Sequence, residues 1–413
     1  MKYSEFNYRF EFDGKEGVFN TFSGAIIVFE SNNENVFNNS VGDLDFNTLE
    51  AYKRAGIVVD DFVDERKILN NNRQDFIDRK SIPIFRILTT YKCNANCFYC
   101  YEDKKQNISM QTCLSESIIE FNKKHIGIDN SVKIQWFGGE PLLNHSIITI
   151  INQALRQNNI KVFNSIISNG SLFSKEIIRM AKKEWDLKNV QITLDGLGIV
   201  HEKRKNYYNF PNSFEQTINV IQQLVENEIK VSIRINYDSL NIDSVYHLIN
   251  YLANKFANNR FIFCYAHHLF DNKYYSTKET SLVETYRINK KLVDAGLSNK
   301  KFLFKHLQPK RGMCGFCCKN SFVIDPNGYL LKCAADSSSN YGSIFDIKDN
   351  NKLIKWTSSS LPEKCCKCIF EPICQGGCRA SHFNDFSCAC FVDSKVIDVI
   401  LNDYIIYCQS KKI

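Results

Sequence analysis

The stretch YKCNANCFYCYE, residues 91–102, places Cys93, Cys97 and Cys100 within eight residues. It follows the apolar run IPIFRILTT, residues 82–90, which is typical of a buried strand. Three thiolates in a tight loop can bind three corners of a [4Fe–4S] cluster and leave one iron open for another ligand. A structural zinc site normally has four ligands, and no histidine or fourth cysteine follows closely after Cys100. The loop therefore favours an iron–sulfur cluster with an open iron.

From residue 84 to about residue 300, strand-like apolar runs alternate with amphipathic helix-like runs. Alternation of this kind builds a parallel sheet through right-handed crossovers. Six such units predict an α/β fold with a partial (β/α)6 barrel, whereas a closed barrel of this type has eight units. The carboxyl ends of the strands are expected to carry the chemistry. The predicted strands are residues 82–90, 132–137, 161–168, 190–195, 230–238 and 260–266.

Cysteine is the unusual part of the composition, with 17 residues in a chain of 413. The first residues do not resemble a signal peptide, and no apolar run approaches the ~18 residues of a membrane span, so we expect a cytoplasmic protein without a membrane partner. Disulfides are rare there, and clustered cysteines more often bind metal. The net charge of +7 is dispersed, which gives no indication of nucleic-acid binding.

The sequence after about residue 305 is rich in cysteine and short of long periodic segments. Metal sites commonly replace a hydrophobic core in such regions. GYLLKC, residues 328–333, places a cysteine five positions after a glycine, and CCKCIFEPICQGGC, residues 365–378, contains a C-x2-C-x5-C-x3-C pattern. On spacing alone, a pair of zinc ribbons is an alternative to iron–sulfur clusters.

The C-x3-C-x2-C motif after a first strand resembles the signature of the radical S-adenosylmethionine (SAM) enzymes. The resemblance implies that Cys93, Cys97 and Cys100 bind a [4Fe–4S] cluster whose open iron is chelated by SAM, which is cleaved to a 5′-deoxyadenosyl radical. Further matching segments are WFGGEPLLN, ISNGSL, QITLDG and IRIN. The SAM-pocket residues implied by the resemblance are Tyr99, Gly138, Gly139, Glu140, Ser168, Asn169, Thr193, Asp195 and Arg234.

The late cysteines resemble the SPASM domain, an extension that holds two auxiliary [4Fe–4S] clusters in peptide-modifying radical SAM enzymes. This resemblance implies three clusters in total. Cys317 could replace Cys314 or Cys318, and Cys388 could replace Cys390. The implied ligands are Cys314, Cys318, Cys333 and Cys378 for one cluster and Cys365, Cys368, Cys374 and Cys390 for the other.

Residues 1–83 are expected to form a small α+β module, ahead of a radical SAM core at 84–304 and a SPASM domain at 305–413. A helix is predicted between Asp45 and Gly56, and the polar stretch 70–81 is predicted to be a linker. VFNTFSGAIIVFE, residues 18–30, resembles the start of peptide maturases whose N-terminal module pairs a strand with the leader of a precursor peptide.

These features together predict a maturase that installs an oxidative crosslink, a thioether or a carbon–carbon bond, in a ribosomally made precursor peptide. Sulfatase maturases typically have Asp directly after the cysteine of the G-x4-C motif, where this chain has Ala334, with Asp336 two positions on. Sulfatase maturation, peptide epimerisation with Cys317 or Cys366 as hydrogen donor, and a non-enzymatic iron–sulfur or zinc scaffold are the alternatives. A leader-bearing precursor peptide and an electron donor such as flavodoxin or ferredoxin are the expected partners.

Overall fold

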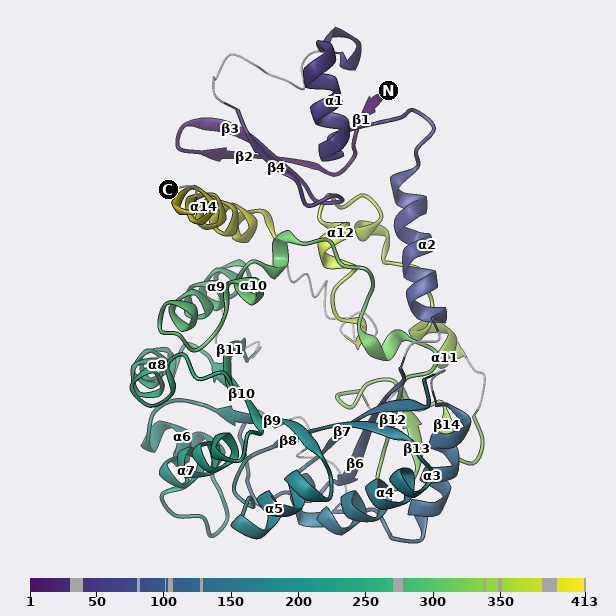
Figure 1. Cartoon of the computed structure of the whole chain (residues 1–413), viewed down its shortest axis with the longest axis vertical. Coiled ribbons are helices and arrows are strands. Elements are labelled where there is room, and N and C mark those ends of the chain that lie inside the picture. Colours follow the sequence, from purple (N-terminus) through teal and green to yellow (C-terminus); the bar gives the residue numbers. More distant parts are fainter. Residues whose placement is uncertain are drawn as a thin grey trace.

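A large sheet that contains six neighbouring parallel strands forms the centre of the molecule (Figure 1). The computed structural model describes residues 1–29, 40–79, 82–100, 102, 107–126, 129–269, 278–336, 339–347, 351–380 and 392–411. Within these ranges the strand order is β11-β10-β9-β8-β7-β6-β12-β13-β14. The six parallel strands are β6 (Ile84–Thr90), β7 (Ser131–Gly138), β8 (Lys161–Ser168), β9 (Leu187–Leu194), β10 (Lys230–Tyr237) and β11 (Ile262–His268).

Helices cover the convex face of this curved sheet, and its concave face stays open (Figure 1). Buried and half-buried residues alternate along the strands, as expected when one face packs and the other does not. Ile134 and Trp136 of β7 join the core under the helices, whereas Gln135 between them is half-buried. The predicted partial (β/α)6 barrel is thereby confirmed. Its helices are α3 (Leu114–Lys124), α4 (His145–Gln157), α5 (Lys175–Lys183), α6 (Ile199–Lys205), α7 (Ser213–Glu226), α8 (Ile242–Phe256) and α9 (Lys278–Asp294).

The cysteine-rich region extends the barrel sheet, which the sequence did not predict. β12 (Phe322–Ile324) pairs in parallel with β6, and the Phe322 ring stacks on Phe85 at a centroid distance of 5.5 Å. β13 (Tyr329–Leu331) and β14 (Gly342–Ser343) continue the sheet in antiparallel pairing. Cys333 follows β13 by two residues, so its position is fixed by the barrel sheet.

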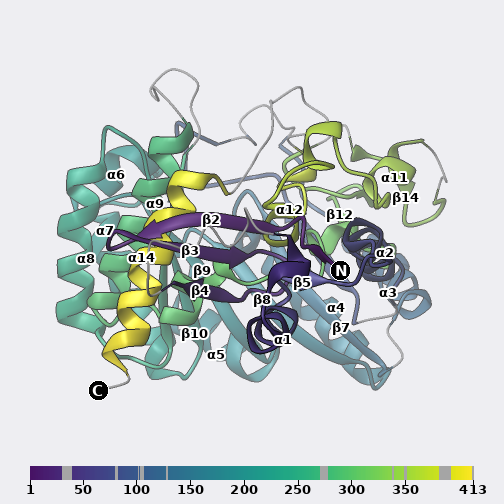
Figure 2. The same ribbon diagram turned by 90° about the horizontal axis from the view of Figure 1, so that it is seen from above.

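A three-stranded antiparallel sheet lies over the barrel at the N-terminal end of the chain (Figure 2). It consists of β2 (Asn7–Phe12), β3 (Lys15–Asn20) and β4 (Ile26–Val28), while β1 (Lys2–Tyr3) pairs with β5 (Val58–Val59). The predicted helix is confirmed as α1 (Phe46–Ala55). Asp45 caps its first turn by accepting from the backbone N–H groups of residues 47 and 48, and Gly56 ends it at φ +72°.

The predicted linker at 70–81 is wrong over most of its length, because α2 runs from Glu65 to Asp78. Asp64 caps the helix, and Leu69, Arg73 and Ile77 form a buried stripe at four-residue spacing. The polar composition concealed the stripe because its middle member is an arginine. Arg73 is buried through an ion pair with Glu371, at an Nη1–Oε1 distance of 2.5 Å.

A second long helix was also missed in the region expected to lack periodic elements. α14 (Ser394–Ser410) packs against α9 and the N-terminal sheet, and the Tyr8 hydroxyl donates to Asp398 Oδ1 at 2.8 Å. Ile397 and Ile400 of α14 pack in one apolar cluster with Phe10 of β2. In the described ranges, no helix is long and apolar enough to cross a membrane. The remaining short helices are α10 (Lys300–Leu303), α11 (Asn351–Trp356) and α12 (Glu371–Cys374).

Candidate active site

The three-cysteine loop begins where β6 ends, at the carboxyl edge of the parallel sheet. The backbone N–H of Cys100 donates to the carbonyl of Cys97 at 3.0 Å, which closes a turn. Burial, with smaller contributions from the nearby Glu140, Cys97 and Cys100, raises the pKa of Cys93 to about 12. Thiols in such surroundings exist as thiolates only when a cation neutralises them, and a bound metal does so. The structure therefore places the three predicted ligands near one another, and their binding of a cluster stays a prediction.

The Gly138–Gly139 pair locks the β7 end onto this loop. The N–H of Gly139 donates to the Thr90 carbonyl at 3.0 Å, and the N–H of Glu140 donates to the Lys92 carbonyl at 2.8 Å. Gly138 has φ +131°, and a Cβ there would lie 2.1 Å from the Thr90 oxygen. A Cβ on Gly139 would lie 2.3 Å from the Lys92 oxygen. Close backbone approach thus requires both glycines, and their predicted contact with SAM stays a prediction.

Glu140 joins the ends of β7 and β8 from a fully buried position. Its Oε1 accepts from the Ser168 hydroxyl at 2.9 Å and from the N–H of Leu142 at 3.1 Å. Its Oε2 accepts from the N–H of Asn169 at 2.8 Å. Burial raises the pKa of Glu140 to about 7, although the hydrogen bonds that it accepts act in the opposite direction. Asn169 Nδ2 in turn donates to Asn94 Oδ1 inside the cysteine loop at 2.8 Å, so three predicted residues converge there.

Tyr99, Asp195 and Lys205 form a buried group beside Cys97. The Tyr99 hydroxyl donates to Asp195 Oδ2 at 2.7 Å, and Lys205 Nζ donates to the Tyr99 hydroxyl at 3.0 Å. Burial alone would lower the pKa of Lys205, but Asp195 and Cys97 raise it overall, so the ammonium is retained. Asp195 Oδ1 is buried without a hydrogen-bond partner in the part of the chain that the structure describes. A polar ligand group would satisfy this oxygen.

Lys205 and its neighbours were missed by sequence reasoning. The segment HEKRKNYY, residues 201–208, has the composition of an exposed basic helix end, yet it covers the cysteine loop. The N–H of Asn96 donates to the Asn206 carbonyl at 3.0 Å, and the N–H of Tyr208 donates to the Asn94 carbonyl at 2.9 Å. The Tyr207 hydroxyl donates to the Asn169 carbonyl at 3.0 Å. Only its place shortly after the predicted strand at residues 190–195 could have indicated that this segment covers the cysteine loop.

Thr193 and Arg234 lie on neighbouring strands and face the open side of the barrel. In the strand register, Arg234 of β10 lies between Thr193 of β9 and Tyr265 of β11, and all three are half-buried. Arg234 Nε donates to Asn236 Oδ1 at 2.9 Å. The guanidinium is also near enough to Lys205 to oppose the rise in the pKa of that lysine. These predicted residues thus lie on the inner face of the barrel strands, near the buried group of Tyr99, Asp195 and Lys205.

Cys314, Cys333 and Cys378 come together beside β13. Burial raises the pKa of the Cys333 thiol, and Cys378 and Cys314 contribute to the rise. Both candidates for the fourth position lie next to Cys314, because Cys314 raises the pKa of Cys317 and of Cys318 after burial. The Cys318 thiol donates to the Phe76 carbonyl of α2 at 3.2 Å. The choice between the two stays open.

Cys365, Cys368 and Cys374 form the third cysteine group. Burial raises the pKa of Cys365, and Cys374 and Cys368 add to this rise. The predicted fourth ligand, Cys390, and its alternative, Cys388, lie outside the described residues. In the described ranges, no three His, Cys, Asp or Glu side chains converge on one point as a single metal ion requires. This absence concerns single metal ions, because the thiolates of a [4Fe–4S] cluster each bind a separate iron atom.

Residues 87–252 match the family model described as the Radical SAM superfamily. An uncharacterised protein of Methanocaldococcus jannaschii, MJ0907, is 38% identical over 112 residues, which are 27% of this chain and 37% of that protein. A GTP 3′,8-cyclase of Clostridium perfringens is 25% identical over 277 residues, which are 62% of this chain and 81% of the cyclase. This chain thus spans only about a third of MJ0907, but most of the cyclase.

Two solved structures share the fold. Native anSMEcpe with bound AdoMet has a TM-score of 0.62 at 18% identity, and the match covers 78% of this chain and 100% of anSMEcpe. Streptococcus suis SuiB bound to its precursor peptide SuiA has a TM-score of 0.56 at 15% identity, with 95% and 99% of the two chains covered. The likeness to these two structures is one of fold, and within it residues 87–252 form the part that matches the Radical SAM family model.

Proposed function

We propose that this protein is a radical SAM peptide maturase that installs an oxidative crosslink, a thioether or a carbon–carbon bond, in a ribosomally made precursor. The observation that carries the proposal is the cysteine loop, which is held at the strand ends beside an unsatisfied buried carboxylate oxygen of Asp195. A peptide substrate is supported by SuiB, whose fold matches 95% of this chain and which binds the precursor SuiA.

The residues of the candidate site fit a cluster with SAM. Cys93, Cys97 and Cys100 would hold the cluster, and when bound, SAM and the iron–sulfur clusters supply the 5′-deoxyadenosyl radical and an acceptor for the second electron. Glu140 accepts from Ser168 and Asn169 and so orients them, and its carboxylate would favour binding of the SAM ammonium. The SAM-pocket residues that we propose are Tyr99, Gly138, Gly139, Glu140, Ser168, Asn169, Thr193, Asp195 and Arg234.

We further propose that the C-terminal cysteines hold two fully ligated auxiliary clusters. One would use Cys314, Cys333 and Cys378 with Cys318 or Cys317, and the other would use Cys365, Cys368 and Cys374 with Cys390 or Cys388. The grouping of the described thiols into two separate neighbourhoods supports this assignment. Iron–sulfur ligation needs reduced thiols, which supports a place in the cytoplasm with flavodoxin or ferredoxin as electron donor.

The N-terminal sheet is the proposed binding site for the leader of the precursor. β2 and β4 are its two outer strands, and the described residues pair each of them on one side only. α14 and α1 pack against opposite faces, through Phe10 and Val18 respectively, so the strand edges remain for an added peptide strand. We propose that the leader binds to residues 1–83, that the radical SAM core is formed by residues 84–304, and that the auxiliary clusters are held by residues 305–413. These regions are in contact with one another through α2, β12 and α14.

Crosslinking is favoured over the two closest alternatives. Ala334 is buried where the general-base aspartate of sulfatase maturation would be expected, although the fold resembles anSMEcpe. Of the two candidate hydrogen donors for epimerisation, Cys317 is fully buried and next to Cys314, and Cys366 is exposed.

Mass spectrometry of a precursor co-expressed with the enzyme, or turned over anaerobically with it, tests the proposal. Candidate precursors are the short open reading frames next to the gene. A crosslinked product is lighter than its precursor by two hydrogen atoms. A product of unchanged mass that gains one deuteron in heavy water would instead establish epimerisation, and conversion of GTP without modification of any peptide would reject a peptide maturase.

A further inference from the structure

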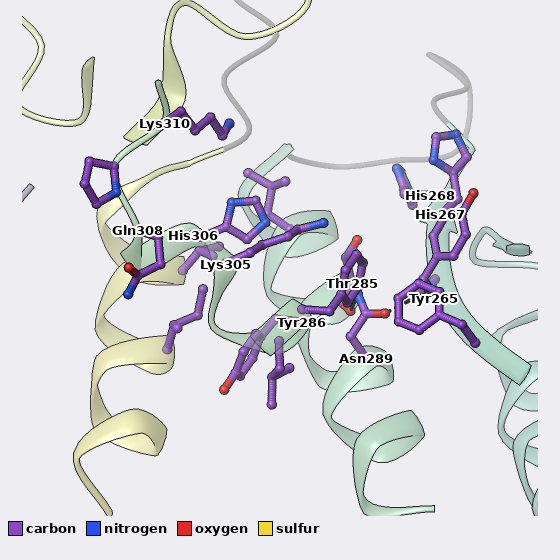
Figure 3. Close-up of a pocket in the computed structure, with 18 residues that line it drawn as sticks. Tyr265, His267, His268, Thr285, Tyr286, Asn289, Lys305, His306, Gln308 and Lys310 are labelled. Carbon is purple, nitrogen blue, oxygen red and sulfur yellow. Dashed lines mark hydrogen bonds between the residues drawn. The ribbon is translucent and has the colours of Figure 1, made fainter. Parts of the chain in front are cut away.

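A cavity of about 600 Å³ lies between β11, α9, residues 302–310 and α14 (Figure 3). None of the SAM-pocket residues or cluster ligands proposed above lines it. Its walls are largely aromatic and aliphatic, with Phe263, Phe302 and Ile400 among them. A cavity of this size with apolar walls and a few polar groups is typical of a ligand site.

The polar lining of this cavity combines lysine and histidine side chains with neutral groups such as Thr285, Asn289 and Gln308. Lys305, His306 and Lys310 line one side, and His267 lines the opposite side (Figure 3). No Asp or Glu is among the lining residues. In the described part of the chain, neither lysine forms an ion pair with a carboxylate. Lys305 and Lys310 are both exposed residues, so an incoming anion can reach them.

The two lysines differ in their surroundings, because Lys305 Nζ lies 3.7 Å from the centroid of the Phe302 ring and Lys310 lies near Cys374, a proposed cluster ligand. Desolvation, with the neighbouring Lys310 second, lowers the pKa of Lys305 to about 8. Burial and the two lysines lower the pKa of His306 to about 3, so its imidazole is neutral. His306 Nδ1 is buried and has no hydrogen-bond partner among the described residues. An anion in the cavity would reduce the repulsion between the lysines and could accept from the imidazole.

We propose that this cavity binds a carboxylate of the peptide substrate, with Lys305, Lys310 and His306 as the groups that recognise it. The inference rests on the proposed function and adds a substrate preference to it. The carboxylate can belong to an Asp or Glu side chain or to the peptide C-terminus. Tyr265 connects the cavity to the barrel, because its hydroxyl donates to Gln191 Oε1 of β9 at 2.9 Å. A peptide anchored in the cavity would therefore extend along the open face of the barrel.

Equilibrium dialysis against the reconstituted holoenzyme with SAM tests the proposal. The probes are acetyl-Phe-Glu-Phe-amide, its Gln counterpart acetyl-Phe-Gln-Phe-amide, and acetyl-Phe-Gln-Phe with a free C-terminus. We expect at least one carboxylate probe to bind about tenfold more tightly than the neutral amide. The preferred carboxylate probe distinguishes a side chain from a C-terminus. Equal binding of all three probes would overturn the proposal.

Matched variants separate the cavity from general electrostatics. Lys305→Gln/Lys310→Gln should abolish the preference for a carboxylate and leave SAM binding unchanged. Lys301→Gln removes one exposed charge on α10, outside the cavity, and should keep the preference. If the double variant retains the preference, the assignment is wrong even though the proposed function stands. If GTP binds in a lysine-dependent manner and no peptide binds, both this inference and a peptide maturase are rejected.

Labelling of the unmodified protein gives an answer that does not depend on the folding of a variant. Because its pKa is lowered to about 8, Lys305 should react with an acetylating reagent at pH 8 several-fold faster than Lys301. The carboxylate probe should slow acetylation of Lys305 and leave Lys301 unaffected. Equal protection by the neutral amide probe would contradict recognition of a carboxylate.

Discussion

Regular structure holds the loop of Cys93, Cys97 and Cys100 on three sides, whereas most of the proposed C-terminal cluster ligands in the described residues lie on turns and very short helices. The first loop is fastened by the β7 end, by the β8 end and by residues 206–208. The later cysteines occupy segments such as Gly315–Cys317, Glu363–Cys365 and Glu371–Cys374. The comparison indicates that the fold itself shapes the first site, and we expect the later sites to depend more on a bound metal.

The largest expected effect comes from removing the ligands of the first loop. Replacing Cys93, Cys97 and Cys100 together by Ala should abolish formation of 5′-deoxyadenosine with dithionite as reductant. Iron should fall from about twelve to about eight per chain, because one of three four-iron clusters is lost. Chromatographic product analysis and iron determination measure both. Cys113→Ala, at an exposed position outside the three groups, is the control, and undiminished cleavage in the triple variant would contradict the assignment.

Removal of iron should affect hydrogen exchange near the C-terminal cysteines far more than in the barrel strands that hold the first loop. After chelation, hydrogen exchange should become much faster in residues 314–321 and 365–378, which lie outside the barrel sheet, because metal binding replaces a core there. Amides of β7 and β8 should keep their protection, since these strands are central in the sheet. Deuterium uptake followed by mass spectrometry checks this. Equal loss of protection in both regions would show that the first site depends on metal as much as the C-terminal sites do.

A smaller effect is expected from Glu140→Gln. The amide of Gln carries no charge. Its NH2 group would also face backbone N–H groups that donate to the carboxylate in the wild type. SAM affinity should therefore fall about tenfold. In the wild type, the pKa of about 7 means that the carboxylate gains a proton as the pH falls through 7. SAM affinity should therefore weaken from pH 8 to pH 6 in the wild type.

The variant should show little pH dependence in this range, and Glu116→Gln, at an exposed position on α3, should behave as the wild type. Binding of SAM measured by equilibrium dialysis at several pH values decides. An identical pH profile in the wild type and the Glu140 variant would show that another group controls SAM binding.

The smallest effect concerns the N-terminal sheet. Binding of a cognate precursor should slow hydrogen exchange in β2 or β4, because an added strand supplies partners for edge N–H groups. A precursor without its leader is the control and should give no protection there. Protection restricted to the barrel, with none in residues 7–12 or 26–28, would argue against leader binding by this sheet.

The sequence predicted the parts of the molecule that follow simple periodicity. Six alternating strand and helix runs gave the partial barrel, and Asp45 and Gly56 marked the ends of α1. α2 was missed because Arg73 occupies the centre of its buried stripe, and its partner, Glu371, lies almost 300 residues away. Interactions across such separations leave no local pattern.

The sequence likewise predicted some residues of the candidate site and missed others. Cysteine spacing and the GGEP segment indicated the loop and its neighbours, and the structure brings Glu140, Ser168 and Asn169 to it. The two glycines have a steric reason that the sequence did not reveal, namely the carbonyls of Thr90 and Lys92. Lys205 was missed because a basic helix end normally faces water, and only its position after a strand end indicated that the tertiary fold could bury it.

Electron paramagnetic resonance of the dithionite-reduced protein, recorded before and after addition of SAM, tests the central claim most directly. If only the loop of Cys93, Cys97 and Cys100 holds a cluster with an open iron, SAM should change the signal of one cluster in the wild type. SAM should then change nothing in the triple Ala variant. A SAM-dependent change that persists in the triple variant would place the open iron among the C-terminal cysteines and contradict the account.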